Sequence, residues 1–143
     1  MTVMEAPSLS LADIDAASVI SFPDGLVGCG DWKHFVLLTS DEEDLPVGVL
    51  QCIDEPAVRF MVTDPRYIDP SYSASISFED RQALGLSPDT KPLIYCTLTV
   101  GNDGAITANL LGPLAINVNT RQAKQLVLND NTYSARHPVG QVG

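Results

Sequence analysis

The chain has 143 residues, of which 45% are apolar, so it is long enough to bury a hydrophobic core as one domain. Its 18 acidic residues outnumber its 8 Lys and Arg residues, which gives a formal net charge of −10. This balance argues against a direct nucleic-acid-binding surface, because neutralising phosphates requires clustered cations.

The negative charge is unevenly distributed along the chain. Residues 1–70 carry 13 acids and three bases, whereas residues 71–143 carry five of each. Four of the acids, Asp41, Glu42, Glu43 and Asp44, form one continuous run. The electrostatic field of these acidic residues would raise the rate of association with a basic partner. The alternative interpretation is an acidic loop that is simply solvated.

Both ends of the chain differ from its centre. Residues 1–17 have little periodicity and predict a weakly ordered segment or a poor first strand, and residues 139–143 predict a flexible tail. Between them, residues 18–138 predict a single domain. No apolar run is long enough to cross a membrane and no secretion signal is visible, so we expect a cytoplasmic protein with no membrane partner.

Short apolar runs separated by turn residues fill the central region. They are rich in β-branched and aromatic residues, and Pro, Gly, Asn and Asp separate them. This pattern predicts a mainly all-β protein with a compact antiparallel β-barrel-like fold. The expected strands lie at 19–22, 35–38, 47–53, 58–62, 93–100, 106–111, 114–118 and 125–128.

Two of these runs alternate with a period of two. In 93–100 the alternation places Ile94, Cys96, Leu98 and Val100 on one face, and in 114–118 it places Ile116 and Val118 opposite Asn117 and Asn119. The pattern changes near residues 78–85, where one short helix is expected. Ser77 is its possible N-cap and Gly85 its stop signal.

No pattern in the chain is typical of catalysis, of a cofactor or of a metal site. The three cysteines, Cys29, Cys52 and Cys96, lack paired spacing and predict reduced thiols. Cys29 and His34 make only a weak ligand pair, and His34 is expected to begin a strand with its ring in solvent. The chain has neither a phosphate-binding loop nor a nucleophile elbow, so we expect a protein that is not an enzyme.

Polar groups are therefore the candidates for binding a partner. Trp32 could anchor an interface, although packing at the edge of the core is the simpler interpretation. Asn side chains recur in the last third of the chain, where some serve turns and others could bond a partner. The candidate partner-binding residues are Asp41, Glu42, Glu43, Asp44, Asn109, Asn117, Asn129 and His137.

Several motifs occur in a specific order between Val19 and Pro138. They include Ile20-Ser-Phe-Pro-Asp-Gly25, Phe60-Met-Val-Thr-Asp-Pro65, Thr107-Ala-Asn-Leu-Leu-Gly-Pro113 and Arg136-His-Pro138. In this order the series resembles the FliW family of flagellar assembly factors. The chain departs from the family at Leu26-Val-Gly-Cys29, where the family usually has Leu-Pro-Gly-Phe.

The resemblance implies a non-enzymatic regulator that binds newly made flagellin and also CsrA, a small RNA-binding repressor of translation. In such proteins, export of flagellin frees the factor to capture CsrA, which relieves repression of flagellin synthesis. The alternative is a small β-barrel ligand-binding module or enzyme that acts on a sugar or nucleotide. That alternative requires a deep pocket in which His137 lies beside a carboxylate and a second base, and a filled interior would weigh against it.

Overall fold

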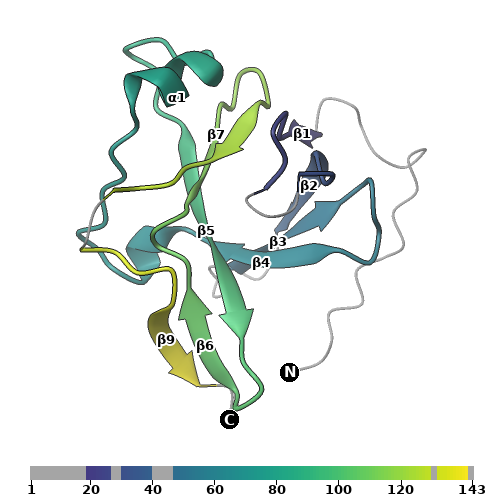
Figure 1. Cartoon of the computed structure of the whole chain (residues 1–143), viewed down its shortest axis with the longest axis vertical. Helices are drawn as coiled ribbons and strands as arrows, with labels where there is room; N and C mark the ends of the chain where they lie inside the picture. Colours follow the sequence, from purple (N-terminus) through teal and green to yellow (C-terminus); the bar gives the residue numbers. More distant parts are fainter. Residues whose placement is uncertain (1–18, 27–29, 40–46, 130–131, 142–143) are drawn as a thin grey trace.

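The structure is a computed structural model that describes residues 19–26, 30–39, 47–129 and 132–141. Over these residues nine strands form a mainly antiparallel sheet that curls into a nearly closed barrel shape, accompanied by one α-helix and one 3-10 helix (Figure 1). The strands are β1 (Ile20–Ser21), β2 (His34–Thr39), β3 (Val47–Cys52), β4 (Arg59–Thr63), β5 (Leu93–Val100), β6 (Ala105–Ala108), β7 (Leu114–Ile116), β8 (Ala123–Gln125) and β9 (His137–Gln141). The predicted all-β, barrel-like fold is confirmed.

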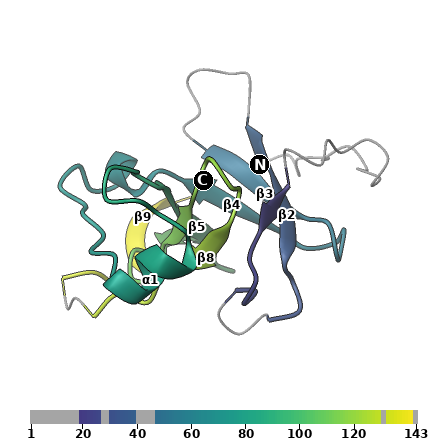
Figure 2. The same ribbon diagram turned by 90° about the horizontal axis from the view of Figure 1, so that it is seen from above.

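The order of the strands places the first and last parts of the chain on opposite sides of β4 and β5. Neighbours run β1-β2-β3-β4-β5-β6-β9, while β7 pairs with β5 and with β8. Figure 2 shows this division from above, with β1 to β3 on one side and β5, β8, β9 and the helix on the other. β5 is therefore the strand that joins the two parts.

A bulge after β6 moves the chain from one section of β5 to another. β6 pairs with Leu98–Val100, and β7 pairs with Leu93–Tyr95 on the same side of β5. Between them, the Asn109 side-chain oxygen accepts hydrogen bonds from the backbone N–H groups of Leu111 (3.1 Å) and Gly112 (2.8 Å). This turn explains physically why the stretch 107–113 combines Asn, Gly and Pro.

Two clusters of side chains fill the interior. One surrounds Phe22 and Phe35, whose rings meet edge to face at 5.4 Å, and it extends to β3, β4 and β7. The other surrounds Cys96 and Leu110, and it includes residues that lie under the helix. Both Phe rings, Cys96 and Leu110 are fully buried, so the centre of this fold is a packed core.

The helix α1 (Phe78–Ala83) confirms the predicted short helix and its cap. The Ser77 hydroxyl oxygen accepts a hydrogen bond from the Asp80 N–H at 3.1 Å, and Gly85 follows with a positive φ of 66°. None of its residues is buried, so the helix is held at its ends and by an ion pair of 2.7 Å between Asp80 and Lys124. Figure 1 shows α1 beside the end of β5 that pairs with β7.

The expected alternation over 116–119 is wrong. Ile116 and Asn117 are both buried, and Val118 is exposed. β7 ends at Ile116, and the chain then turns tightly, with the Arg121 N–H donating to the Asn117 carbonyl at 2.8 Å. A turn has no period of two, so the faces assigned from a strand pattern do not apply there. In β5, Cys96 is buried as expected, whereas Val100 near the end of the strand is 41% exposed.

The C-terminal segment also differs from the expectation. Residues 139–143 were predicted to be a flexible tail, but His137–Gln141 forms β9 and pairs with β6 with a register shift between Ile106 and Thr107. Figure 1 shows β6 and β9 side by side. A short polar segment with Pro138 has weak strand propensity, so its pairing depends on the neighbouring edge of β6. Residues 1–18 and 142–143 lie outside the described residues.

Other strands are confirmed with shifted ends. The run expected at 106–111 is a strand only over Ala105–Ala108, and the run expected at 125–128 is a strand over Ala123–Gln125. Across the parts of the chain that the structure describes, no helix is long and apolar enough to span a membrane.

Candidate partner-binding site

A groove opens where β4 and β5 diverge. The pairing of these strands ends at Thr63 with Cys96, although β5 itself begins three residues earlier, at Leu93. After Thr63 the chain enters the 3-10 helix Pro65–Tyr67, which Asp64 caps by accepting a hydrogen bond from the Arg66 N–H at 2.9 Å. The resulting cavity has a volume of about 870 Å³.

The start of β5 forms one wall of this groove. The carbonyl of Thr97 accepts a hydrogen bond from Asn109 at 3.0 Å and therefore points towards the β6 side. Because successive backbone groups of a strand alternate between its two edges, those of Ile94 point to the side that β4 has left. Leu93, Ile94 and Tyr95 all line the cavity, so this edge of β5 is a strand edge that faces the groove.

The lining of the groove is positively charged, unlike the chain as a whole. Among the residues that the structure describes, Arg66, Arg81 and Lys91 line it with one carboxylate, Asp64, and together these four side chains carry a formal charge of +2. The Arg66 guanidinium contacts both carboxylate oxygens of Asp64, at 2.9 and 3.2 Å. These hydrogen bonds hold the pKa of Asp64 below its usual range, against the opposing effect of partial burial.

Arg81 and Lys91 are the other two cations of the lining. Arg81, in the last turn of α1, donates from Nη2 to the carbonyls of Ser87 (2.8 Å) and Thr90 (3.4 Å), which fixes its side chain. Lys91 is exposed and immediately precedes Pro92 and β5. The groove therefore has one mobile ammonium group and two guanidinium groups held by the protein.

Apolar surface is exposed in the same groove. Tyr67 is 71% exposed and Leu93 is 42% exposed, so both present apolar surface to the solvent at the groove. Tyr95 is half-buried beside them, and burial raises the pKa of its phenol. A groove that combines exposed aromatic surface, cations and a strand edge can bind a polypeptide.

Within the described part of the chain, none of the residues that sequence patterns marked as partner-binding lines this groove. Asp41, Glu42, Glu43 and Asp44 lie outside the described residues. The Asn109 amide is engaged in the bulge after β6, as described above. Asn129 is exposed after β8, and His137 is half-buried at the start of β9, where it pairs with Ala108.

Asn117 is 2% exposed and connects two elements of the fold. Its Nδ2 donates to the carbonyl of Leu84 at 2.8 Å and to that of Gly85 at 3.4 Å, and its Oδ1 accepts from Asn119 N–H at 3.0 Å. The amide therefore satisfies carbonyls at the end of α1, and its bonds are made within the protein.

The sequence predicts Leu93 to Tyr95 only as the start of a strand and assigns no role to Lys91 and Pro92. The signal that could have revealed the groove is the Asp64-Pro65 pair at the end of β4. A proline there lacks the N–H that would continue the ladder, which predicts that the pairing of β4 ends at this point. The sequence alone does not show that β5 is the strand that pairs with β4, so it could not place residues 93–95 beside Pro65.

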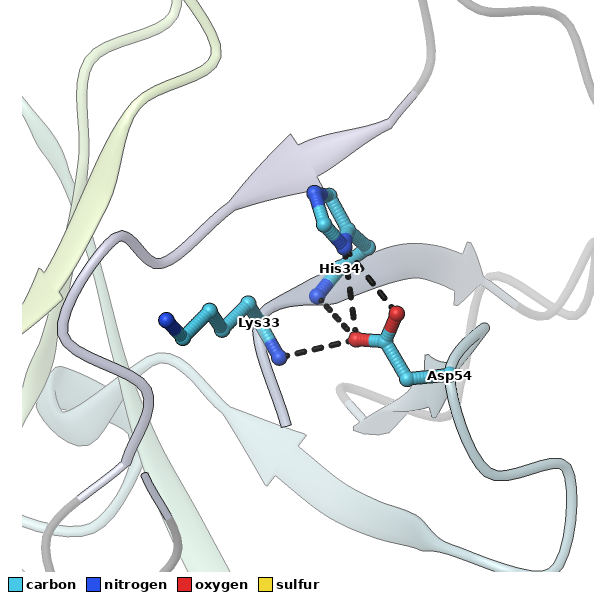
Figure 3. A network of polar contacts seen from close by, with 3 residues as sticks. All are labelled: Lys33, His34 and Asp54. Carbon is cyan, nitrogen blue, oxygen red and sulfur yellow. Dashed lines mark hydrogen bonds and ion pairs between the residues drawn. The ribbon is translucent and has the colours of Figure 1, made fainter. Parts of the chain in front are cut away.

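His34 begins β2 with its ring 51% exposed, as predicted. Its Nδ1 lies 3.1 Å from Asp54 Oδ1, and Asp54 Oδ2 accepts from the backbone N–H groups of Lys33 and His34, each at 2.9 Å (Figure 3). Partial burial raises the pKa of Asp54, but these hydrogen bonds together outweigh it and leave the pKa below its usual range. The arrangement ties the start of β2 to the turn after β3.

The remaining candidates have structural positions. Trp32 is half-buried against the core, with its ring centroid 6.2 Å from that of Phe60, as expected for the edge of the core. Cys52 and Cys96 are free and buried, and burial raises the pKa of the Cys96 thiol to about 12. Cys29 lies outside the described residues. Within the described part of the chain, no group of three or more His, Cys, Asp or Glu side chains is placed to hold a metal ion.

Comparisons with known proteins place these features in one family. A family model described as FliW protein matches residues 4–139. A flagellar assembly factor FliW from Thermoanaerobacter pseudethanolicus is 32% identical over 92% of this chain and 89% of its own length. Another protein of that name, from Bdellovibrio bacteriovorus, is 34% identical over 89% of this chain and 73% of its own length.

A solved structure shows the same fold. The crystal structure of a flagellar assembly factor FliW superposes on this chain with a TM-score of 0.80 and 31% sequence identity, covering 89% of both chains. The match of the family model, over residues 4–139, includes the β4–β5 region as well as the motifs between Val19 and Pro138. The chain belongs to the FliW family.

Proposed function

We propose that this chain is a non-enzymatic flagellar assembly factor that binds flagellin and a CsrA-type RNA-binding regulator in the cytoplasm. The observation that carries the proposal is the family match over residues 4–139, together with relatives that are named flagellar assembly factors. In this role the protein couples flagellin synthesis to export. While flagellin accumulates it occupies the factor, and after export the freed factor captures the regulator.

The distribution of charge supports two partners of different character. The acidic first half of the chain attracts a basic RNA-binding protein and disfavours RNA on the same assembly. The groove between β4 and β5 has the opposite charge and exposed apolar surface. The described lining of the groove therefore differs in sign from the net charge of the first half of the chain, which fits two partners of different charge.

A pocket-based enzyme is the less favoured candidate. It would need His137 in a deep pocket beside a carboxylate and a second base, but His137 does not line the groove. The centre of the fold is occupied by the two core clusters. Binding of proteins at the surface therefore fits the geometry better than chemistry inside a barrel.

Isothermal titration calorimetry with purified full-length partners tests the proposal. The protein is titrated separately with monomeric flagellin and with the CsrA-type regulator of the same organism, and then with the regulator after saturation by flagellin. We expect binding to each partner alone and weakened binding of the regulator to the flagellin complex. Binding to neither partner would refute the proposed function. If the regulator binds the flagellin complex as tightly as the free protein, flagellin does not exclude the regulator and the proposed coupling is wrong.

A further inference from the structure

We propose that the groove between β4 and β5 is the flagellin site, and that it holds an extended, acidic segment of flagellin which adds as a strand to the free edge of β5. This inference rests on the proposed function for the identity of the partner. The groove itself is defined by the structure: a cavity of about 870 Å³, a strand edge at Leu93–Tyr95, and three cations among its lining residues.

The backbone geometry favours an extended occupant. Beyond the pair of Thr63 with Cys96, the register assigns no β4 residue to β5, and the next residue but one after Thr63 is Pro65, which has no N–H to donate. The backbone N–H and C=O groups of Ile94 therefore face the groove and do not pair with β4. An extended segment satisfies such an edge with main-chain hydrogen bonds, as in strand addition.

The charge of the lining selects between the two proposed partners. The charged side chains among the described lining residues together carry a formal charge of +2, although the whole chain carries −10. A basic RNA-binding regulator would be repelled from such a lining. A segment with carboxylate side chains is attracted, and Lys91 is the cation best able to reach it, because Arg66 and Arg81 already bond to protein oxygens.

Exposed side chains supply the apolar part of the contact. Tyr67 and Leu93 stand at the groove with 71% and 42% of their surfaces exposed. An aromatic side chain at the centre of an interface commonly carries a large share of the binding energy. Alternate side chains of an added strand would pack on Tyr67 and Leu93, while the others face solvent.

Two pairs of matched variants test the site. Lys91→Glu reverses a charge at the groove, and Lys33→Glu makes the same change in net charge at an exposed position that does not line it. Tyr67→Ala removes an exposed aromatic ring at the groove, and Phe78→Ala removes one that is 72% exposed on α1 and also does not line it. All four residues are on the surface, so each variant is expected to fold.

Calorimetry with full-length monomeric flagellin is the first measurement. We expect Lys91→Glu and Tyr67→Ala each to raise Kd by about tenfold or more, and Lys33→Glu and Phe78→Ala to leave it within about twofold. Affinity for the CsrA-type regulator should not fall in the groove variants. Unchanged flagellin affinity in both groove variants would overturn the inference and leave the proposed function standing.

Hydrogen exchange is the second measurement, because it reports strand addition directly. Saturation with flagellin should slow backbone exchange in the segment 92–96 of the wild-type protein at the Ile94 amide, because Pro92 has no N–H, β7 pairs with Leu93 and Tyr95, and β4 pairs with Cys96. If affinity falls in the groove variants but exchange in that segment is unchanged, the occupant does not pair with β5 and the strand-addition model is wrong. If the wild-type protein does not bind flagellin at all, the proposed function fails, and with it the occupant named here.

Discussion

Single buried amides determine how separate elements of this protein are joined. Gln51 is 6% exposed, and its Nε2 lies within hydrogen-bond distance of the carbonyls of Cys52, Pro56 and Val58, which closes the β3–β4 turn. Asn117 does the same between β7 and the end of α1. Each amide replaces backbone partners that a loop or helix end cannot supply, and a carbonyl left unpaired in the interior is costly.

Asn117→Ala should therefore destabilise the fold more than replacing an exposed polar residue by Ala. The substitution leaves the Leu84 carbonyl without its 2.8 Å partner, and we expect a loss of about 1–3 kcal/mol in the free energy of unfolding. Urea denaturation followed by circular dichroism measures this loss. The matched control is Asn119→Ala, whose exposed side chain should contribute within about 0.5 kcal/mol. Equal stability of the two variants would show that the Asn117 amide does not hold α1.

At the scale of elements, the turn between β1 and β2 depends on the backbone conformation of Gly25. Between β1 and β2, Gly25 has a φ of 68°, and its N–H donates to the Phe22 carbonyl at 2.8 Å. A Cβ at Gly25 would lie 2.5 Å from the Cα of Gly30, so the two chain segments meet at a distance that only glycine permits. This close approach explains the glycine of the Pro23-Asp24-Gly25 sequence beyond its role as a turn signal.

Gly25→Ala should cost more than about 2 kcal/mol, because left-handed strain adds to a backbone clash. Gly140→Ala in β9 is the matched control, since a Cβ there meets no atom within 4 Å. We expect the control to change the free energy of unfolding by less than about 0.5 kcal/mol. Thermal denaturation of both variants distinguishes them, and a Gly25→Ala protein as stable as wild type would contradict the packing of this turn.

At the scale of the whole molecule, the divergence of β4 from β5 is the feature that gives the fold its groove. A sheet closed along its whole length would leave no strand edge there, whereas the 3-10 helix Pro65–Tyr67 opens the sheet over three residues of β5. The net charge of −10 acts over a longer range than these contacts and governs how fast a charged partner arrives.

Charge reversal of the run Asp41–Asp44 to lysines should slow association with the basic CsrA-type regulator. At low salt we expect a reduction of roughly tenfold in the association rate, because electrostatic steering depends on the field of the whole chain. Stopped-flow fluorescence measures the association rate. A variant with neutral Asn and Gln at the same four positions should have a rate between those of the wild-type protein and the lysine variant. The rates should converge as salt screens the charges. An unchanged rate at low salt would direct the search to another surface.

The elements that local patterns predicted correctly are those whose causes are local. Ser77 caps α1 through a bond to a residue three positions away, and β5 occupies the predicted run Leu93–Val100. The family motifs, too, were recognisable in the sequence. The predictions that failed concern β9, which pairs with the distant strand β6, and the residues after Ile116, where a tight turn replaces the expected strand.

The sequence by itself determined the all-β class, most of the strands, the helix and the family of this protein, because hydrophobic period, caps and turn residues act over a few neighbouring positions. Only the tertiary structure decided that the pairing of β4 with β5 ends before Pro65. It also decided that Arg66, Arg81 and Lys91 line one groove and that Asn117 is buried. Those features depend on which strand edges meet. Strand pairing joins residues that are distant in the chain, and no local pattern specifies it.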